Sequence, residues 1–495
     1  MKSALTIICF VLICISTNAQ SAERRLSAAQ MQQDLHVLHD AWTALHPGIY
    51  RYNSVANLES YFQQLYKVCA EPIGEKRFYV LLAQLAEKIK CGHTYLNPLN
   101  LDDSVNARFI YQKVIPIFFV VTAGNKLVIT HDMSGMGIER GDEIVSVNGY
   151  GTKRIIDSLL TVSRSDGRNA LNKKLNNINE TPDEAKSHSL FDIFFPLFFG
   201  VNDDQYTVVV KKFVTGKQRT VLIKAISIKE RMSLYEAKYG KLQTAAQTWE
   251  YKKMNEGTTY MRFGTFALWN SKFDGKRYID SVFSDLLGRS EVKNLIIDIR
   301  NNEGGDNSGD LILSYIATKK LGCDDPDHRC YSYLKVPDTL KKYLSTWDPS
   351  FKKPKDSSKY FVNEIGLYEQ KKEKDDCEGI EPKQNIFKGK IYLLTNAKNS
   401  SAGYEMARDF KRAKLGMIVG EPTGGSQQGI NGGEFFFLTL PYSKIEIDLP
   451  LVYNYHPDKP DRGIEPDHLV PTTQKGIANE VDEQMEFVLK NLMRR

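Results

Sequence analysis

Apolar positions follow a helical period through the first hundred residues. Ser27-Ala28-Ala29-Gln30 fits a capping box, which marks the start of a helix. Apolar residues then recur at the spacing of one helix face, at Met31, Leu35, Leu38, Trp42 and Leu45. Pro47-Gly48 ends this helix. The pattern predicts a helical domain over residues 20–100 with two more helices, the last running directly into Cys91-Gly92-His93-Thr94.

Short apolar strands replace this period from about residue 114. Strands are predicted at 115–120 and 126–129, and a third strand ends at an Asn-Gly turn. A helix over 154–160 follows. Residues 165–200 are a polar, Asn-rich insertion that ends in an aromatic patch, which is either a lid or a packed loop. The patch consists of Phe191, Phe194, Phe195, Phe198 and Phe199.

Strands and helices alternate from about residue 250. Residues 295–299, 391–395 and 417–420 are continuous apolar strands, the type that is buried on both faces of a sheet. This patterning predicts an α/β core over 245–475, followed by a C-terminal helix over 476–495. Residues 318–385 are rich in Lys, Asp and Glu and interrupt the pattern as an insertion.

The first residues have the features of a secretory leader. A positive Lys2 precedes an apolar run over 5–15, and small residues follow it, so residues 1–19 are interpreted as a signal peptide. The run is too short to span a membrane, and no later segment approaches the roughly 20 apolar residues of a transmembrane helix. Cys14 lies in a poor lipobox, so lipid anchoring is not expected. The mature protein is expected to be exported, either periplasmic or extracellular.

Composition and charge narrow the class further. The 495 residues are enough for two to four domains. The formal net charge is +6, but Lys and Arg are interleaved with acids and form no basic stripe, so nucleic acid is not an expected partner.

Five cysteines remain after the leader, so in an oxidising compartment at least one thiol is unpaired. Cys323 and Cys330 form either a disulfide or two thiols. No zinc-knuckle spacing is present, and neither a metal nor an organic cofactor is expected.

Two segments carry candidate catalytic groups. The strand at 295–299 leads to Gly304-Gly305, where a backbone N–H can point at a developing oxyanion. The strand at 391–395 leads to Ser400-Ser401-Ala402 at the start of an amphipathic helix. Ser401 there is either a helix N-cap or a nucleophile, and the N–H of Ala402 is a second oxyanion donor.

These segments resemble the tail-specific (C-terminal processing) and tricorn families of serine peptidases. Residues 295–305 are similar to the Asp-Leu-Arg-x-Asn-x-Gly-Gly signature, and the Ser-Ala pair of the nucleophile turn assigns Ser401 rather than Ser400. Tyr404 stands where many members carry Glu. In the Gly-Glu-x-Thr-x-Gly turn, Ser426 stands where the Ser/Lys branch has its catalytic Lys, and 417–439 contains no Lys.

The resemblance therefore assigns the base elsewhere. Gly92-His93-Thr94 is similar to a signature of tricorn-like members, which implies His93 as the general base, although Gly92 replaces that branch's Ser. A local structural role for His93 is the alternative. Arg462-Gly463-Ile464-Glu465-Pro466-Asp467 is similar to the family's C-terminal Gly-Val/Ile-x-Pro-Asp signature. The tricorn acid lies just before that Gly, and the best match here is Pro460, which cannot serve, so the resemblance leaves Asp461 and Glu465 as substitutes.

Residues 138–149 resemble part of a PDZ domain, because a Gly-Asp turn leads into a strand that ends at an Asn-Gly turn, and a generic hairpin is the alternative. The implied architecture is a multidomain α/β protein: an N-terminal helical cap, a PDZ-like β module over 110–235 and a β/α spiral (ClpP/crotonase-like) peptidase core. PDZ domains bind extended peptides at a sheet edge, so protein or peptide substrates are the expected partners. The alternatives are a catalytically degenerate peptide-binding protein and, from the crotonase-like spiral alone, an enzyme of acyl-CoA, which export disfavours.

Overall fold

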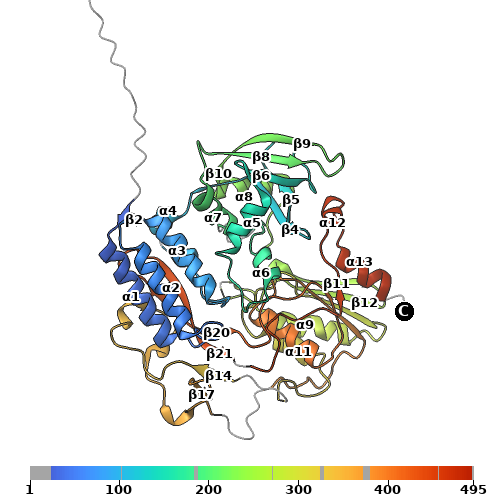
Figure 1. The fold of residues 1–495 in the computed structure, drawn as a ribbon. Coiled ribbons are helices and arrows are strands. Elements are labelled where there is room, and N and C mark those ends of the chain that lie inside the picture. The colour runs from blue at the N-terminus through green and yellow to red at the C-terminus, as the bar shows by residue number, and fades with distance from the viewer. Residues whose placement is uncertain are drawn as a thin grey trace, which may run out of the picture.

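The structure is a computed structural model that describes residues 24–101, 103–182, 188–269, 271–323, 328–371, 379–454 and 456–492. Figure 1 shows three parts, with the N-terminal helices beside a β module and the α/β core below that module. The predicted leader, at 1–19, lies outside the described residues, as does Cys377. No helix in the described ranges is long and apolar enough to cross a membrane.

The helical part forms as the apolar period predicts. Its helices are α1 (Ala28–Leu45), α2 (Val55–Val68), α3 (Glu75–Lys88) and α4 (Asp103–Phe109). The capping box is confirmed, because the Ser27 hydroxyl accepts from the Gln30 N–H and the Gln30 side chain accepts from the Ser27 N–H. All five apolar residues that define the period of α1 are fully buried.

The β module is a sheet with strand order β4-β5-β6-β8-β9. Its strands are β4 (Ile117–Thr122), β5 (Lys126–Asp132), β6 (Glu143–Val147), β8 (Gln205–Lys211) and β9 (Gln218–Lys224), with β7 (Tyr150–Gly151) beside β6 and a separate pair, β3 (Lys113–Val114) and β10 (Ile226–Ser227). Its helices are α5 (Thr152–Leu160), α6 (Leu171–Asn176), α7 (Leu190–Phe199) and α8 (Ile228–Tyr239). The aromatic patch is α7, and Phe191, Phe194 and Phe195 are buried, so the patch is a packed element and not a lid.

The core sheet has the order β11-β12-β13-β18-β19-β22 and is parallel from β12 to β22. Its strands are β11 (Trp249–Asn255), β12 (Thr258–Phe263), β13 (Asn294–Asp298), β18 (Lys390–Thr395), β19 (Met417–Gly420) and β22 (His468–Leu469). Helices α9 (Gly275–Leu287), α10 (Ser308–Ser314) and α11 (Ala402–Arg412) connect them. The carboxyl ends of β13 and β18 are neighbours, which brings the two catalytic segments together.

A second six-stranded sheet, β15-β20-β21-β14-β17-β16, joins the predicted insertion to the core. The insertion supplies β14 (Arg329–Tyr331), β15 (Leu344–Ser345), β16 (Tyr360–Val362) and β17 (Tyr368–Gln370), and the core supplies β20 (Asn431–Thr439) and β21 (Glu446–Asn454). Buried residues of β20 and β21 share one hydrophobic cluster with α1, α3 and the β module. The insertion is therefore an integral part of the fold and not an independent appendage.

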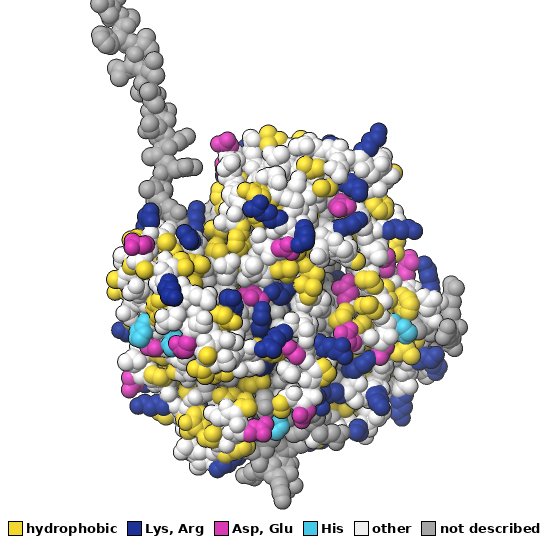
Figure 2. Space-filling model, viewed as in Figure 1, with side chains coloured by type: hydrophobic (Ala, Val, Ile, Leu, Met, Phe, Trp, Pro, Cys, Tyr) yellow, Lys and Arg dark blue, Asp and Glu magenta, His cyan; other side chains and the backbone are white. Residues whose placement is uncertain are grey.

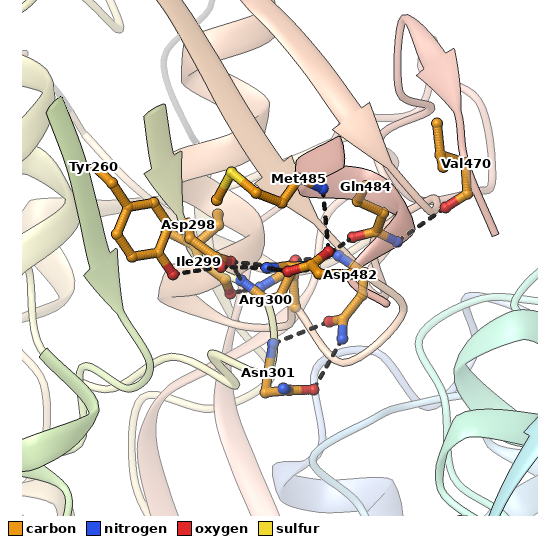
Figure 3. A network of polar contacts seen from close by, with 11 residues as sticks. Tyr260, Asp298, Ile299, Arg300, Asn301, Val470, Asp482, Gln484 and Met485 are labelled. Atoms are coloured by element: carbon orange, nitrogen blue, oxygen red, sulfur yellow. Dashed lines mark hydrogen bonds and ion pairs between the residues drawn. The ribbon is translucent and has the colours of Figure 1, made fainter. Parts of the chain in front are cut away.

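The chain ends in α12 (Gln474–Ala478), α13 (Glu483–Phe487) and a π-helical turn over 488–492, where one C-terminal helix was predicted. Arg300, just after β13, donates to Asp298 (Nη2–Oδ2 2.6 Å) and to Asp482 at the start of α13 (Nη2–Oδ2 2.7 Å). Figure 3 shows this network, in which Tyr260 also donates to Asp298. The C-terminal helices are thereby fixed to the turn that follows β13.

The open question about the cysteines is decided against a Cys323–Cys330 pair. Cys323 is disulfide-bonded, but Cys330 retains a thiol, which donates to the carbonyl of His328 (3.5 Å). On the face in Figure 2, basic and acidic side chains are intermixed, in keeping with the absence of a basic stripe in the sequence.

Candidate active site

Ser401 has an unusual backbone conformation at the turn between β18 and α11. Its φ is 49° and its ψ is −133°, a region that non-glycine residues rarely adopt and that costs about 1–3 kcal/mol. It occupies the N-cap position of α11, yet its side chain makes no cap hydrogen bond. The N-cap interpretation therefore does not account for the residue, and the strain holds its hydroxyl in a sharp strand–turn–helix connection.

The backbone donors around Ser401 are Gly305 and Ala402. Ala402 is the first residue of α11, and neither its N–H nor that of Gly305 donates to an acceptor in the described residues. The N–H of Gly304 is occupied, because it donates to the Asn302 side chain (2.9 Å). Gly304 and Gly305 were the alternatives for one donor, and the hydrogen bonding leaves Gly305.

Gly304 has a steric role instead. A Cβ on Gly304 would lie 2.7 Å from the Ser401 Cβ and 2.8 Å from the Ala402 nitrogen, so only glycine lets the two turns approach. Gly305, with φ of 141°, forms a parallel bridge with Phe266. In this bridge the Phe266 N–H donates to the carbonyl of Gly304, and the Asp306 N–H donates to the carbonyl of Phe266. Its own N–H is thereby left pointing away from that pairing.

Two fully buried asparagines hold the turns together. The Asn302 amide donates to the carbonyl of Phe263 (2.9 Å), and the Asn399 amide donates to the carbonyl of Asn302 (3.1 Å). The turn after β13 and the nucleophile turn therefore have a fixed separation before any substrate binds.

His93 follows α3 and lines the same cavity as Ser401 and Gly305. The cavity has a volume of about 1050 Å³ and lies between the helical part, the core and the second sheet. Burial lowers the pKa of His93. The charges of Arg164 and Lys173 lower this pKa further, whereas those of Asp166 and Glu303 raise it. The neutral imidazole that a general base requires is therefore favoured. Its Nδ1 is buried and has no hydrogen-bond partner among the residues that the structure describes.

The backbone around His93 is anchored on both sides. His46, which is buried, bonds the Thr94 hydroxyl through Nε2 (2.8 Å) and accepts the Gly48 N–H at Nδ1 (3.1 Å). Because Nδ1 accepts, Nε2 carries the proton and donates to Thr94. Burial lowers the pKa of His46 to about 3, so this histidine stays neutral and structural.

Segment 164–173 of the β module also contacts the site, and the sequence motifs did not reveal it. Asp166 accepts from the Gly92 N–H (2.8 Å) and Arg164 donates to the Gly92 carbonyl (3.1 Å), so both hold the residue before His93. A Cβ on Gly92 would lie 2.5 Å from Asp166 Oδ2, so the carboxylate occupies the space of a side chain at position 92.

Lys173, on α6, connects the same segment to the two catalytic turns. Its Nζ donates to Glu303 Oε1 (2.9 Å), next to the glycine pair, and to the carbonyl of Lys398 (3.2 Å), before the nucleophile. Lys173 is almost fully buried, whereas the Glu303 side chain is 47% exposed. Burial by itself raises the pKa of Glu303, but Lys173, Lys398 and Arg164 lower it to about 2. In Figure 1, α6 lies between the β module and the core.

The two acids named from the sequence lie elsewhere. Asp461 accepts from Tyr52 OH (2.8 Å), the Arg168 N–H (2.9 Å) and Ser426 Oγ (3.1 Å). Glu465 is half exposed and lies 4.0 Å from Arg462. Neither lines the cavity of His93. The carboxylates that do line it are those of Asp166, Glu303, Asp310, Glu405, Asp409 and Asp448.

The departures at Tyr404 and Ser426 have local structural explanations. Tyr404 is fully buried under Gly425, where an added Cβ would meet its ring at 2.7 Å. Ser426 is fully buried, and its hydroxyl donates a hydrogen bond to the carboxylate of Asp461. No group of three or more His, Cys, Asp and Glu side chains in the described ranges is arranged to hold a metal ion.

A strained serine between a parallel strand and a helix, in a cavity that is also lined by two residues whose N–H groups donate to no acceptor in the described residues, is an arrangement typical of enzymes with a serine nucleophile. Residues 257–470 match the model of peptidase family S41. Residues 257–470 are therefore similar to peptidase family S41, which supports a serine peptidase that acts on proteins or peptides.

Two solved structures support the fold. The chain is similar to mature CPAF complexed with lactacystin, with 13% identity, a TM-score of 0.64, and coverage of 94% of this chain and 97% of that one. Mature CPAF itself gives 14% identity and a TM-score of 0.62, with coverage of 94% and 96%. The photosystem II D1 C-terminal processing protease gives 16% identity and a TM-score of 0.40, with coverage of 92% and 97%. No curated protein matches the chain significantly.

Proposed function

We propose that this chain is an exported serine endopeptidase in which Ser401 is the nucleophile and His93 is the general base. The observation that carries the proposal is the strained Ser401, which makes no cap hydrogen bond and lines the same cavity as Gly305 and Ala402, whose N–H groups donate to no acceptor in the described residues. Strain of this kind persists only where surrounding structure enforces it, and here the buried Asn302 and Asn399 do so. The predicted leader over 1–19 supports export.

The proposed reaction is acyl transfer to Ser401. Its Oγ attacks the peptide carbonyl carbon while its proton passes to neutral His93, and the negative oxygen accepts from the N–H groups of Gly305 and Ala402. The C–N bond breaks as His93 returns the proton to the leaving amine. Water then attacks the acyl-enzyme, with His93 again as base, and releases the acid and free Ser401.

The acidic partner that we propose for His93 is Asp166 rather than Asp461 or Glu465. Asp166 holds the backbone of Gly92 and raises the pKa of His93, whereas the other two bind groups outside the cavity. It acts as a positioning residue, through the turn that carries the histidine.

For the PDZ-like module we propose a role in assembling the site. Its edge strand β4, the expected place for an added peptide strand, is already paired at Phe119, which exchanges both backbone hydrogen bonds with Glu180 (3.0 and 2.9 Å). Asn179 also accepts from the Val121 N–H (2.7 Å). The chain's own segment thus occupies that position, and the same segment leads back to α6 and Lys173.

The alternative function is a peptide-binding protein that has lost catalysis. Two observations favour it: Ser426 stands in place of the branch lysine, and His93 Nδ1 is buried without a partner to orient the ring. The cavity would then bind a peptide without turnover.

Labelling by a fluorophosphonate separates the two functions. The mature wild-type protein is expected to be labelled and to cleave an unfolded protein, and Ser401→Ala is expected to lose both with its melting temperature within a few degrees. Ser400→Ala is the matched control, because its hydroxyl faces the carbonyl of Glu303 (3.4 Å) and should be dispensable. Absence of labelling and cleavage in the wild type, with peptide still bound, would establish the binding protein instead.

A further inference from the structure

An aromatic surface lies beside His93 in the cavity. It consists of Trp347, Phe435 and Phe437, and we call it the aromatic row. The Phe435 ring lies 5.6 Å from the His93 ring and 5.5 Å from the Trp347 ring, and Phe437 lies 5.7 Å from Trp347. All three line the cavity that contains Ser401.

The aromatic row departs from the normal pattern of a half-buried strand. Along β20, Phe436 and Leu438 are fully buried in the hydrophobic core, so Phe435 and Phe437 project from the opposite face. Such a face normally carries polar residues. Trp347 comes from the predicted insertion and is 59% exposed. Phe435 and Phe437 are partly buried, so the row is accessible but not fully exposed. Accessible aromatic side chains that cluster in a cavity indicate a binding surface.

The backbone beside the aromatic row is also open. Strand β15 pairs only with Phe437 and Leu438 of β20, so among the described strands none covers residues 432–435 on that side. An extended peptide can lie along such an uncovered edge, where main-chain hydrogen bonds supply affinity and side-chain pockets supply specificity.

We propose that the aromatic row is the specificity subsite of this peptidase and that it takes a large apolar side chain of an extended peptide, within two residues of the bond that Ser401 attacks. The occupant that we propose is a side chain of the substrate. The Phe435 ring contacts the His93 ring, so a group that is bound on this surface lies directly beside the reacting groups. The inference deepens the proposed function and rests on it for the placement of the reacting bond.

The test compares Trp347→Ala and Phe437→Ala with Phe213→Ala, a matched aromatic control in the β module that is 37% exposed and lies outside the cavity. Cleavage sites of the wild type in an unfolded protein are first mapped by mass spectrometry. Peptides built on one site then carry Phe, Leu, Ala or Lys at each flanking position in turn.

The wild type is expected to prefer Phe or Leu over Ala at one flanking position. Trp347→Ala and Phe437→Ala should lower kcat/KM about tenfold for the Phe and Leu peptides and leave the Ala peptides nearly unchanged. Both variants should still be labelled by diisopropyl fluorophosphate at the wild-type rate. The control Phe213→Ala should match the wild type in its labelling rate and in kcat/KM for every peptide. Equal losses for all peptides, or no loss, would overturn the subsite.

Binding measurements separate this inference from the proposed function. Dissociation constants of the same peptides, measured on Ser401→Ala protein with and without Trp347→Ala, test the subsite without turnover. If the wild type is neither labelled nor active, the proposed function fails, while a Phe preference in binding that Trp347→Ala removes still supports the subsite. If Trp347→Ala only converts a dimer to a monomer in sedimentation, the aromatic row is an interface between copies and the inference is wrong.

Discussion

Ser401 combines the chemistry of a nucleophile with an unfavourable backbone conformation. Replacement by Gly removes the steric cost at a φ of 49°, whereas replacement by Ala keeps it. We expect both variants to be inactive and Ser401→Gly to be more stable than Ser401→Ala by about 1 kcal/mol in urea unfolding. Equal stabilities would mean that the turn is not strained and would remove the main support for the nucleophile.

The protonation of His93 provides a second test at the residue scale. Its pKa is lowered by burial and raised by Asp166, so Asp166→Asn is expected to lower the pKa further. A general base works when it is neutral, so the low-pH limb of the labelling rate should move to lower pH in Asp166→Asn. A limb that moves to higher pH, or stays in place while the rate is unchanged, would contradict the role of Asp166.

Residues that lie in sequence motifs could be predicted, and residues that act from a distance could not. The Gly pair and the Ser-Ala pair each follow a strand, so the sequence alone places each of them at the end of a strand, and the structure shows that the two strands are neighbours. The choice between Gly304 and Gly305 depended on one side-chain acceptor, Asn302, and only the structure reveals that bond. Asp166 approaches His93 through the missing side chain of Gly92, a contact that no local pattern encodes.

At the scale of elements, α6 connects the β module with the catalytic turns. Lys173 forms an ion pair with Glu303 and donates to the carbonyl of Lys398. A double-mutant cycle with Lys173→Met and Glu303→Gln is expected to give a coupling energy of about 1 kcal/mol in the labelling rate, since water screens the half-exposed Glu303.

The neighbouring lysine is the control for this cycle. Lys174 donates to Glu87 (2.7 Å) on α3 and does not line the catalytic cavity, so Lys174→Met should leave the labelling rate near that of the wild type. Equal losses in Lys173→Met and Lys174→Met would indicate a general loss of stability rather than a specific contact with the catalytic turns.

The elements themselves followed their sequence patterns closely where one face or both faces are apolar. α1, β13 and β18 form where the apolar period or run predicts them. The strands inside the predicted insertion, 318–385, could not be predicted, because they are two or three residues long and lie among charged residues. β14 and β15 are stabilised by their partners β21 and β20, which lie far away in sequence, and β17 and β16 extend the sheet from β14.

At the scale of the whole molecule, the site is assembled from three parts of the fold. His93 comes from the helical part, Asp166 and Lys173 from the β module, and Ser401 from the α/β core. The integrity of the β module should therefore control the reactivity of a serine that lies outside it.

Arg231 allows that dependence to be measured. It is buried and donates to Glu180 (Nη1–Oε2 3.0 Å) and to Asp192 (Nη2–Oδ2 2.7 Å). Glu180 follows the end of α6 by four residues and pairs with β4, so Arg231 supports the segment that carries α6. Arg231→Met would leave two buried carboxylates uncompensated, at a cost of about 3–5 kcal/mol. We expect lower stability in urea, and slower labelling of Ser401 at temperatures where the core is still folded. Arg154→Met, at an exposed arginine of α5, should change neither property. If Arg231→Met lowers stability while the folded fraction is labelled at the wild-type rate, the β module does not assemble the site.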